Sequence, residues 1–254
     1  MLSIALLGTG NVAKHLFDAL LRQNEVQVVQ VAGRNKEALT YFEKDIKITT
    51  NFDHIDDADI YIIAISDDAI SLVSERLMDK KGLVVHTSGS VSMQALKRNQ
   101  RRGVFYPLQT FSKTKKIDFK GIPICIEAAN ENDLKLLQLL GGAISNKVSE
   151  ISSEQRESLH LAAVFVNNFT NHLYHIGHEI CKENKVPFHM LKPLIMETAQ
   201  KINDLTPLEA QTGAARRNDM ETIRKHIHQL ENNAYREIYS LLNQSIRKTY
   251  GEKL

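Results

Sequence analysis

Short, continuous apolar runs rich in Val and Ile alternate with helix-like segments through the first 150 residues of the chain. The runs have the length of strands, and they are bounded by glycines and polar residues. Strands that are apolar on both faces and separated by helices are typical of a parallel sheet covered by helices on both sides. We predict strands at 2–7, 26–32, 60–65, 83–87, 121–127 and 143–148, and helices at 11–22, 36–44, 68–78, 92–98 and 131–140.

The pattern becomes entirely helical after about residue 150. The segment from Ser153 to Lys182 contains one Gly and no Pro, which predicts a long helix. Pro187 can open the next helix, and Asn218 with Glu221 resembles the start of another. The sequence therefore predicts an α/β domain with a mostly parallel, doubly wound sheet, residues 1–150, followed by an all-α domain, residues 151–254.

Composition narrows the classes of function. The hydrophobic set makes up 43% of the residues, and 32 basic against 30 acidic side chains give a net charge of +2. Such a balance does not favour nucleic acid as a partner. No apolar run approaches the roughly 20 residues that a membrane span needs. Cys125 and Cys181 lie far apart in the sequence, as expected of free thiols, so we expect a cytoplasmic protein.

A glycine-rich turn follows the first predicted strand and opens the first predicted helix. It reads Gly8-Thr9-Gly10-Asn11-Val12-Ala13. In a dinucleotide fingerprint the first glycine allows the tight turn, and the second lets the backbone approach a pyrophosphate at the helix N-terminus. We therefore expect Gly8, Thr9, Gly10, Asn11 and Val12 to bind a dinucleotide in a Rossmann-type domain. The alternative is an ordinary glycine turn of an α/β protein.

The end of the second predicted strand bears on which dinucleotide is bound. Proteins that bind NAD usually carry an acidic residue there for the ribose hydroxyls. This chain has Arg34 and Asn35 at that point and no acid. A carboxylate would repel a 2′-phosphate, whereas a guanidinium can bind it through two hydrogen bonds. The sequence therefore predicts NADP(H) as the cofactor, with Arg34 as a surface residue at the strand end as the alternative.

Loops after the later strands should reach the same crevice, because parallel strands end at one edge of the sheet. Ser66 and Asp67 follow the third of these strands and Ser88 follows the fourth, while Gln109 lies in a further polar loop, residues 106–111. We expect Ser66 and Asp67 to contact the cofactor, Ser88 to take part in catalysis and Gln109 to contact the substrate. The same serines and aspartate could also cap the helices that follow.

One side of the predicted long helix carries polar residues within an apolar stretch. At 100° per residue, His160, Asn167, Asn171 and His178 fall on that side. The side faces either a wet active-site cleft or bulk solvent. In a cleft, His160 is the candidate general acid, because histidine titrates near neutral pH, and Asn168 or Asn167 is the candidate to orient a substrate carbonyl or imine.

Several other chemistries lack support in the sequence. His172, His175 and His178 spread over about 120° of a helix and carry no accompanying H-E-x-x-H pattern, so no metal site is expected. There is also no G-x-S-x-G motif and no Walker lysine, which leaves hydrolase and P-loop functions without a motif.

Taken together, several motifs resemble a bacterial family of Rossmann-like NADP oxidoreductases with a C-terminal helical domain of undefined function. They lie at residues 8–13, 64–70, 86–89, 107–111, 159–165 and 212–219. The family is similar in plan to pyrroline-5-carboxylate reductase, the deazaflavin-dependent NADP oxidoreductases and the β-hydroxyacid dehydrogenases. The resemblance implies a homodimer formed through the helical domain, which completes the active site against the nicotinamide.

The chain departs from these families at three places. Tyr106 stands where the family often has His, and Ala214 replaces the Pro of its T-G-P-A-x-R-x-D motif, which leaves Arg217 and Asp219 as the matching polar residues. The β-hydroxyacid dehydrogenases use a Lys early in the long helix, where this chain offers His160. The resemblance implies hydride transfer between the nicotinamide and a small C=O or C=N substrate, or a deazaflavin. Arg217 would pair either with a substrate carboxylate or with Asp219. The alternative is a non-catalytic NADP(H)-binding sensor or regulatory dimer.

Overall fold

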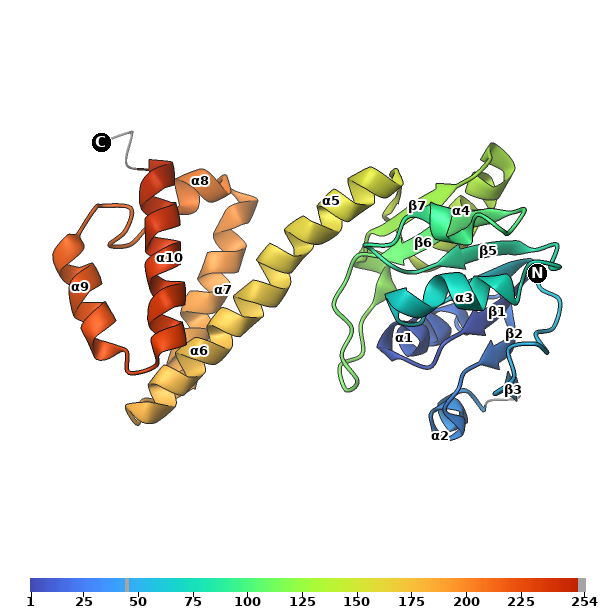
Figure 1. The fold of residues 1–254 in the computed structure, drawn as a ribbon, viewed down its shortest axis with the longest axis horizontal. Coiled ribbons are helices and arrows are strands. Elements are labelled where there is room, and N and C mark those ends of the chain that lie inside the picture. The colour runs from blue at the N-terminus through green and yellow to red at the C-terminus, as the bar shows by residue number, and fades with distance from the viewer. Residues whose placement is uncertain (44–45, 251–254) are drawn as a thin grey trace. The chain divides into compact units, whose positions relative to one another are not determined.

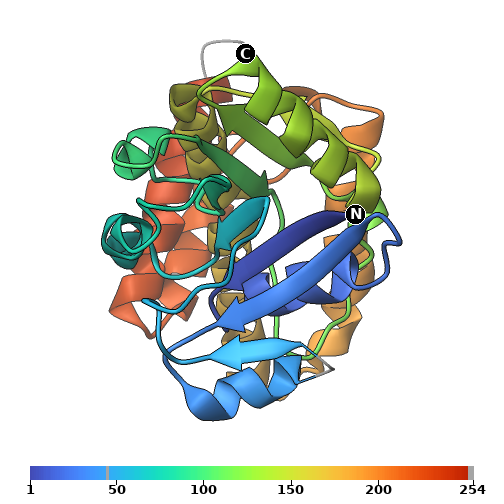
Figure 2. The same ribbon diagram turned by 90° about the vertical axis from the view of Figure 1, so that its right-hand side faces the viewer.

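The computed structural model describes residues 1–43 and 46–250. Its sheet has the strand order β3-β2-β1-β4-β5-β6-β7-β8, and every neighbouring pair is parallel except β6 with β7. Figures 1 and 2 show this sheet from two sides. The strands are β1 (Leu2–Leu7), β2 (Val26–Ala32), β3 (Lys47–Thr49), β4 (Ile60–Ile63), β5 (Leu83–His86), β6 (Arg102–Pro107), β7 (Ile124–Ala128) and β8 (Val148–Glu150).

Helices cover both faces of the sheet, as the continuous apolar strands require. The helices α1 (Asn11–Leu20) and α4 (Glu131–Ile144) pack on one face, where Leu16, Phe17 and Leu140 meet strand residues such as Ile62. The helix α3 (Ile70–Glu75) covers the other face. The shorter elements are α2 (Lys36–Leu39) and the 3₁₀ turns η1 (Thr40–Phe42), η2 (Asp67–Ala69), η3 (Met93–Leu96) and η4 (Phe119–Gly121).

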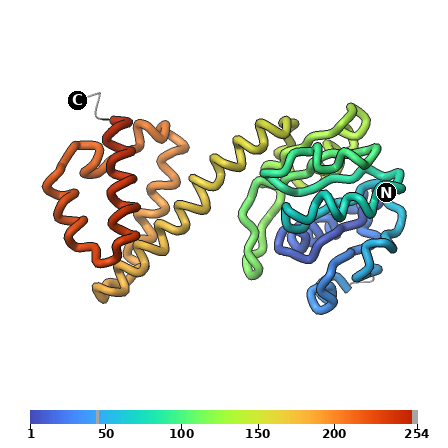
Figure 3. Tube along the Cα trace, in the orientation of Figure 1, coloured from blue at the N-terminus to red at the C-terminus, as the bar shows by residue number. Residues whose placement is uncertain are grey.

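The remaining elements are helical, and the path of the chain through them can be followed in Figure 3. The predicted long helix is present, but its middle is π-helical. Its parts are α5 (Ser153–Ala163), the π segment η5 (Val164–Phe169) and α6 (Thr170–Glu183). They are followed by η6 (Phe188–Leu191), α7 (Lys192–Gln200), η7 (Lys201–Asn203), α8 (Pro207–Ala210), α9 (Met220–Gln229) and α10 (Asn233–Tyr250).

The α/β sheet with a helical C-terminal region confirms the predicted fold class, while several element assignments were wrong. Residues 143 and 144 finish α4, and the last strand comes later, because apolar Ala143 and Ile144 cover the sheet from a helix rather than lie in it. The segment 102–107 is a strand that the sequence did not predict. Asp219, not Asn218, caps α9, since Asn218 takes a left-handed conformation with φ +56°.

The chain divides into two compact units, Met1–Asn168 and Phe169–Leu254. The sequence placed the division at residue 150, before the long helix, whereas this boundary falls inside the π segment. The first unit therefore includes α5, and with it His160, together with the whole sheet.

Candidate functional site

A pocket of about 550 Å³ lies at the carboxyl ends of the parallel strands within the first unit. It is lined by the turns that follow β1, β2, β4 and β5, by the end of β6 and by one residue of α5, His160. This is the edge at which doubly wound sheets bind ligands. Of the residues predicted from the sequence, it is lined by Gly8, Thr9, Gly10, Val12, Arg34, Asn35, Ser66, Asp67, Ser88, Gln109 and His160.

The glycine turn has the geometry of a pyrophosphate cradle. Gly8 has φ +137°, and a Cβ there would lie 2.0 Å from the carbonyl oxygen of Ala64. A Cβ on Gly10 would meet nothing within 4 Å, and Gly10 precedes α1 without any side chain capping the helix. The open space beside Gly10 and the uncapped N-terminus of α1 fit an approaching phosphate group.

Arg34 is exposed at the end of β2, where the sequence predicted it. It forms no ion pair with any residue in the ranges 1–43 and 46–250. It also lines an adjoining, mostly apolar pocket of about 340 Å³ with Phe52, Ile65 and Leu72. The nearby Asp53 is paired with Arg76 at 2.6 Å. An unpaired guanidinium beside an apolar pocket suits a 2′-phosphate next to an adenine ring.

Two predicted cofactor residues have structural partners. The Asn35 side chain accepts a hydrogen bond of 3.0 Å from the backbone N–H of Ala38 and so caps α2. Asn11 does not line the pocket, because its side-chain amide donates to the carbonyl of Phe111 at 3.0 Å. It thereby ties the loop after β6 to α1. Any contact of Asn11 with a pyrophosphate would come from its backbone N–H.

The serine-rich loop after β5 is held by its own hydrogen bonds. Ser88 Oγ accepts from the backbone N–H groups of Ser90 and Val91, each at 3.1 Å. The Ser90 hydroxyl in turn donates to the carboxylate of Asp67. The buried Ser88 hydroxyl therefore caps the loop, and the catalytic role predicted for it stays a prediction.

His160 and Tyr106 form a hydrogen-bonded pair in the pocket. The Tyr106 hydroxyl lies 3.0 Å from Nδ1 of His160, and the two rings meet edge to face with centroids 6.0 Å apart. Burial raises the pKa of Tyr106 to about 12, so the phenol keeps its proton at neutral pH. The two residues are 54 positions apart in the sequence, and sequence reasoning identified only the loop around Tyr106, not the pair.

Gly89 allows this pair to pack against the loop after β5. A Cβ at Gly89 would lie 2.5 Å from Nδ1 of His160 and 2.8 Å from Cζ of Tyr106. Only glycine can therefore occupy this position while both rings stay in place. The glycine, the phenol and the imidazole form one wall of the pocket.

The remaining predicted site residues lie elsewhere. Asn168 is exposed and does not line the pocket. It follows His160 by eight residues, or about 12 Å of α-helix, and η5 shifts its direction, since π-helical bonds span five residues rather than four. Arg217 is an exposed residue of the second unit. The roles predicted for Asn168 and Arg217 in substrate binding stay predictions.

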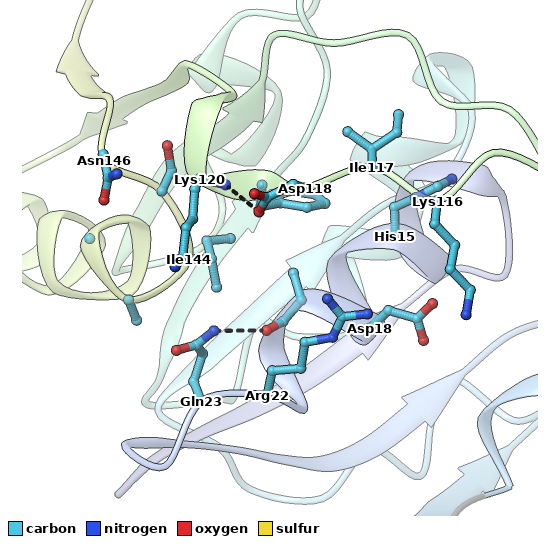
Figure 4. Close-up of a pocket in the computed structure, with 15 residues that line it drawn as sticks. His15, Asp18, Arg22, Gln23, Lys116, Ile117, Asp118, Lys120, Ile144 and Asn146 are labelled. Carbon is cyan, nitrogen blue, oxygen red and sulfur yellow. Dashed lines mark hydrogen bonds between the residues drawn. The ribbon is translucent and has the colours of Figure 1, made fainter.

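A second pocket of the first unit, about 390 Å³, lies at the C-terminal ends of α1 and α4. Figure 4 shows Arg22, Lys116 and Lys120 around it, with Asp18 and Asp118. Helix C-termini carry partial negative charge, so cationic side chains there compensate the helices. This pocket is therefore a poorer phosphate site than the one beside the N-terminus of α1.

The described residues contain neither a cluster of metal-ligating side chains nor a helix that could span a membrane. No group of three or more His, Cys, Asp or Glu side chains in residues 1–43 and 46–250 is arranged to hold a metal ion. The rings of His172 and His175 are 6.1 Å apart and tilted. In the same ranges, none of the helices has both the length and the apolar character that a bilayer crossing requires.

The sheet, the glycine turn and the pocket at the strand ends define a Rossmann-type dinucleotide-binding protein with a helical C-terminal region. A family model described as "NADP oxidoreductase coenzyme F420-dependent" matches residues 3–88, and one described as a domain of unknown function, DUF2520, matches residues 122–246. No curated protein matches the chain.

Solved structures give the family. The chain is 40% identical to a "putative NADP oxidoreductase" from Bacteroides fragilis, with a TM-score of 0.91 over 97% of this chain and 98% of that one. The chain therefore belongs to this family of NADP oxidoreductases, as its motifs predicted.

Two more distant structures share the fold. Protein TM1727 from Thermotoga maritima is 19% identical, with a TM-score of 0.74 over 98% of this chain and 99% of that chain. An imine reductase from Myxococcus stipitatus, in complex with NADP+, is 14% identical, with a TM-score of 0.68 over 99% of this chain and 95% of that chain.

Proposed function

We propose that the protein is an NADP(H)-dependent oxidoreductase that moves hydride between the nicotinamide and a small substrate with a C=O or C=N bond. The observation that carries this proposal is a single pocket that contains both the glycine turn with Arg34 and the Tyr106–His160 pair. The family name, and the NADP+ bound to an imine reductase of the same fold, support the cofactor.

In this proposal the cofactor is bound by the pocket residues that follow β1, β2 and β4. The backbone of Gly8, Thr9 and Gly10 and the N-terminus of α1 hold the pyrophosphate, and Arg34 holds the 2′-phosphate. Bound NADPH supplies the hydride. Ser66 and Asp67, which follow β4, line the same pocket and would contact the bound cofactor.

In this proposal His160 binds the reacting group of the substrate. Its imidazole lines the pocket, and Nδ1 is hydrogen-bonded to Tyr106. Among the residues that the structure describes, Nε2 has no hydrogen-bond partner. Nε2 is therefore available for a substrate oxygen or nitrogen. Gln109 also lines the pocket, and its side-chain oxygen accepts from the N–H of Thr110 at 2.8 Å, which leaves its amide NH₂ for a substrate.

The test is turnover of NADPH with a panel of ketones, aldehydes and cyclic imines, and with oxidised coenzyme F420. Turnover is measured as the decrease in the absorbance of the reduced nicotinamide. We expect turnover with at least one member and its loss in His160→Ala with NADPH affinity retained. Tight NADPH binding with no turnover on any member would favour the sensor function instead. Full turnover by His160→Ala would remove His160 from the chemistry.

We also propose that the protein is a homodimer in the cytoplasm. Many large apolar side chains of the second unit are exposed: Leu173, Val186, Met190, Leu194, Met196, Ile202, Leu205, Leu208, Leu241 and Leu242. Covering such side chains contributes about 1.5–3 kcal/mol each, so a second copy of this unit is the partner that we propose. Both cysteines are free thiols, which suits a reducing compartment.

A further inference from the structure

We propose that Tyr106 fixes the tautomer of His160, so that the neutral imidazole carries its proton on Nε2 and offers a hydrogen-bond donor to the substrate. Tyr106 is thus a positioning residue that acts through His160. The statement that a substrate accepts a hydrogen bond from Nε2 rests on the proposed function. The tautomer of His160 does not, because it can be measured on the protein without cofactor or substrate.

The geometry of the pair carries the first step. A neutral imidazole has one N–H donor and one bare nitrogen acceptor, and the partner of one nitrogen decides the state of the other. The Tyr106 hydroxyl is 3.0 Å from Nδ1. A phenol gives up its proton more readily than the N–H of a neutral imidazole does. The stronger arrangement therefore has the phenol donating and Nδ1 accepting, which leaves the ring proton on Nε2.

The surroundings keep Tyr106 a donor. It lies opposite Cys125 in the antiparallel pairing of β6 with β7, and burial raises the pKa of both side chains. The phenol and the thiol are therefore both neutral at physiological pH. No phenolate is present to accept a hydrogen bond from an Nδ1–H group.

The surroundings also keep the two rings together. Gly89 packs against Nδ1 and Cγ of His160, and a Cβ there would lie 2.5 Å from Nδ1. Arg156, one helical turn before His160, is fully buried and bonded to Glu127. The loop after β5 and the anchored first turn of α5 thus hold the imidazole in place. Nδ1 bonds to Tyr106, and Nε2 has no partner among the residues that the structure describes.

The tautomer selects among the substrates that the proposed function allows. An Nε2–H donor matches a heteroatom that keeps a lone pair, which is a carbonyl oxygen or a neutral imine nitrogen. It does not match an iminium nitrogen, which has no lone pair. We therefore expect this pocket to favour carbonyl compounds and neutral imines over permanently charged iminium ions.

The test reads the tautomer directly. Long-range proton–nitrogen correlation spectra of the ¹⁵N-labelled full chain, without coenzyme and at a pH where the imidazoles are neutral, distinguish the two tautomers. Loss of a signal set in His160→Gln assigns it. We expect the Nε2–H tautomer in the wild type and a mixture of tautomers in Tyr106→Phe. The Nδ1–H tautomer in the wild type, or an unchanged pattern in Tyr106→Phe, would overturn the proposal.

The chain offers a matched control in its second unit, where the Tyr239 hydroxyl lies 2.8 Å from Nδ1 of His226. Tyr239→Phe should change the His226 signals alone. Unchanged signals of His15, which lies in the same unit as Tyr106 with Nε2 2.9 Å from the carbonyl oxygen of Ser112, show that Tyr106→Phe is folded. If Tyr106→Phe does not fold, Gly89→Ala tests the same contact, because its Cβ would crowd both Nδ1 of His160 and the ring of Tyr106. A Gly89→Ala variant that loses the Tyr106–His160 hydrogen bond and keeps the tautomer would contradict the proposal.

Turnover gives an independent readout. We expect kcat of Tyr106→Phe to fall about fivefold to tenfold, the worth of one hydrogen bond, with the KM for NADPH unchanged. A KM change without a kcat change would contradict the positioning role. Absence of turnover in the wild type would count against the proposed function and leave the tautomer result standing.

Discussion

The guanidinium of Arg156 donates a 2.6 Å hydrogen bond to the carboxylate of Glu127, and this buried ion pair joins the first turn of α5 to β7. Arg156 also donates to the carbonyl of Val91 at 2.6 Å and to the hydroxyl of Ser153 at 3.2 Å. The helix that carries His160 is therefore anchored to the sheet and to the loop after β5, one turn before the imidazole.

Removing the guanidinium should destabilise the protein strongly. In Arg156→Met the Glu127 carboxylate would lose its ion-pair partner while mostly buried and would keep only the hydrogen bond from the Ser153 hydroxyl. Such a loss typically costs about 3–5 kcal/mol. Chemical denaturation measures this, with Lys47→Met as the control, because the Lys47–Asp56 pair is exposed and worth less than about 1 kcal/mol. Equal losses in the two variants would show that burial of the Arg156 pair does not matter.

Arg34 should decide the preference between coenzymes. A charge-assisted hydrogen bond to a 2′-phosphate contributes about 1.5–3 kcal/mol, so Arg34→Ala should raise the Kd for NADPH by about 10-fold or more and leave that for NADH unchanged. Calorimetry on both coenzymes measures this. Lys36→Ala, a nearby exposed lysine outside the pocket, is the matched control. Equal affinity of the wild type for both coenzymes would contradict the prediction.

Gly10→Ala should separate cofactor binding from folding. A Cβ there meets no protein atom within 4 Å and φ is −74°, so we expect the free energy of unfolding to change by about 1 kcal/mol or less. The same methyl group would occupy the approach of the pyrophosphate, and NADPH affinity should fall sharply. Gly142→Ala, also open within 4 Å, should bind NADPH normally. Wild-type affinity in Gly10→Ala would place the pyrophosphate elsewhere.

The sheet and its crevice could be predicted from local signals. Continuous β-branched runs between helices define a parallel sheet, and parallel strands bring their following loops to one edge. Ser66, Ser88 and Gln109 therefore line the pocket although they are distant in the sequence. The glycine turn after β1 predicted where along that edge the dinucleotide binds.

The pairing inside the site could not be predicted in the same way. Pro107 and the polar residues after it indicated a loop, so the strand β6 that carries Tyr106 was missed, together with its contact to His160. The π segment was also invisible, because a helical wheel assumes 100° per residue throughout, and Asn168 lies inside that segment. Both features depend on tertiary packing rather than on local periodicity.

The exposed apolar side chains of the second unit should be covered by a second copy. Leu194 on α7 is 63% exposed, and a charge there would oppose burial at an interface. We expect sedimentation equilibrium to give twice the chain mass of 28.8 kDa for the wild type and the single mass for Leu194→Glu. Leu139→Glu, on a residue of α4 that is 71% exposed, should leave the dimer intact. A wild-type monomer would contradict the proposed dimer.

His86 should make the stability of the protein depend on pH in acid. The side chain is fully buried at the end of β5, and its Nδ1 accepts from the N–H of Ser88 at 3.2 Å. Burial, helped by the charge of Arg156, lowers the pKa of His86 to about 4. In the unfolded chain a histidine has a pKa of about 6.5. Above that pH both states are neutral and the shift has no effect on stability.

As the pH falls from about 6.5 to about 4, the unfolded chain takes up a proton at this site before the folded protein does. The free energy of unfolding should therefore drop by up to about 1.4 kcal/mol per pH unit, and by about 3 kcal/mol in all. Urea titrations between these pH values measure the slope. Because other groups also titrate, the comparison is with His86→Gln, which carries no titrating group and should have the shallower slope. Parallel slopes in the two proteins would mean that His86 is not held neutral by the fold.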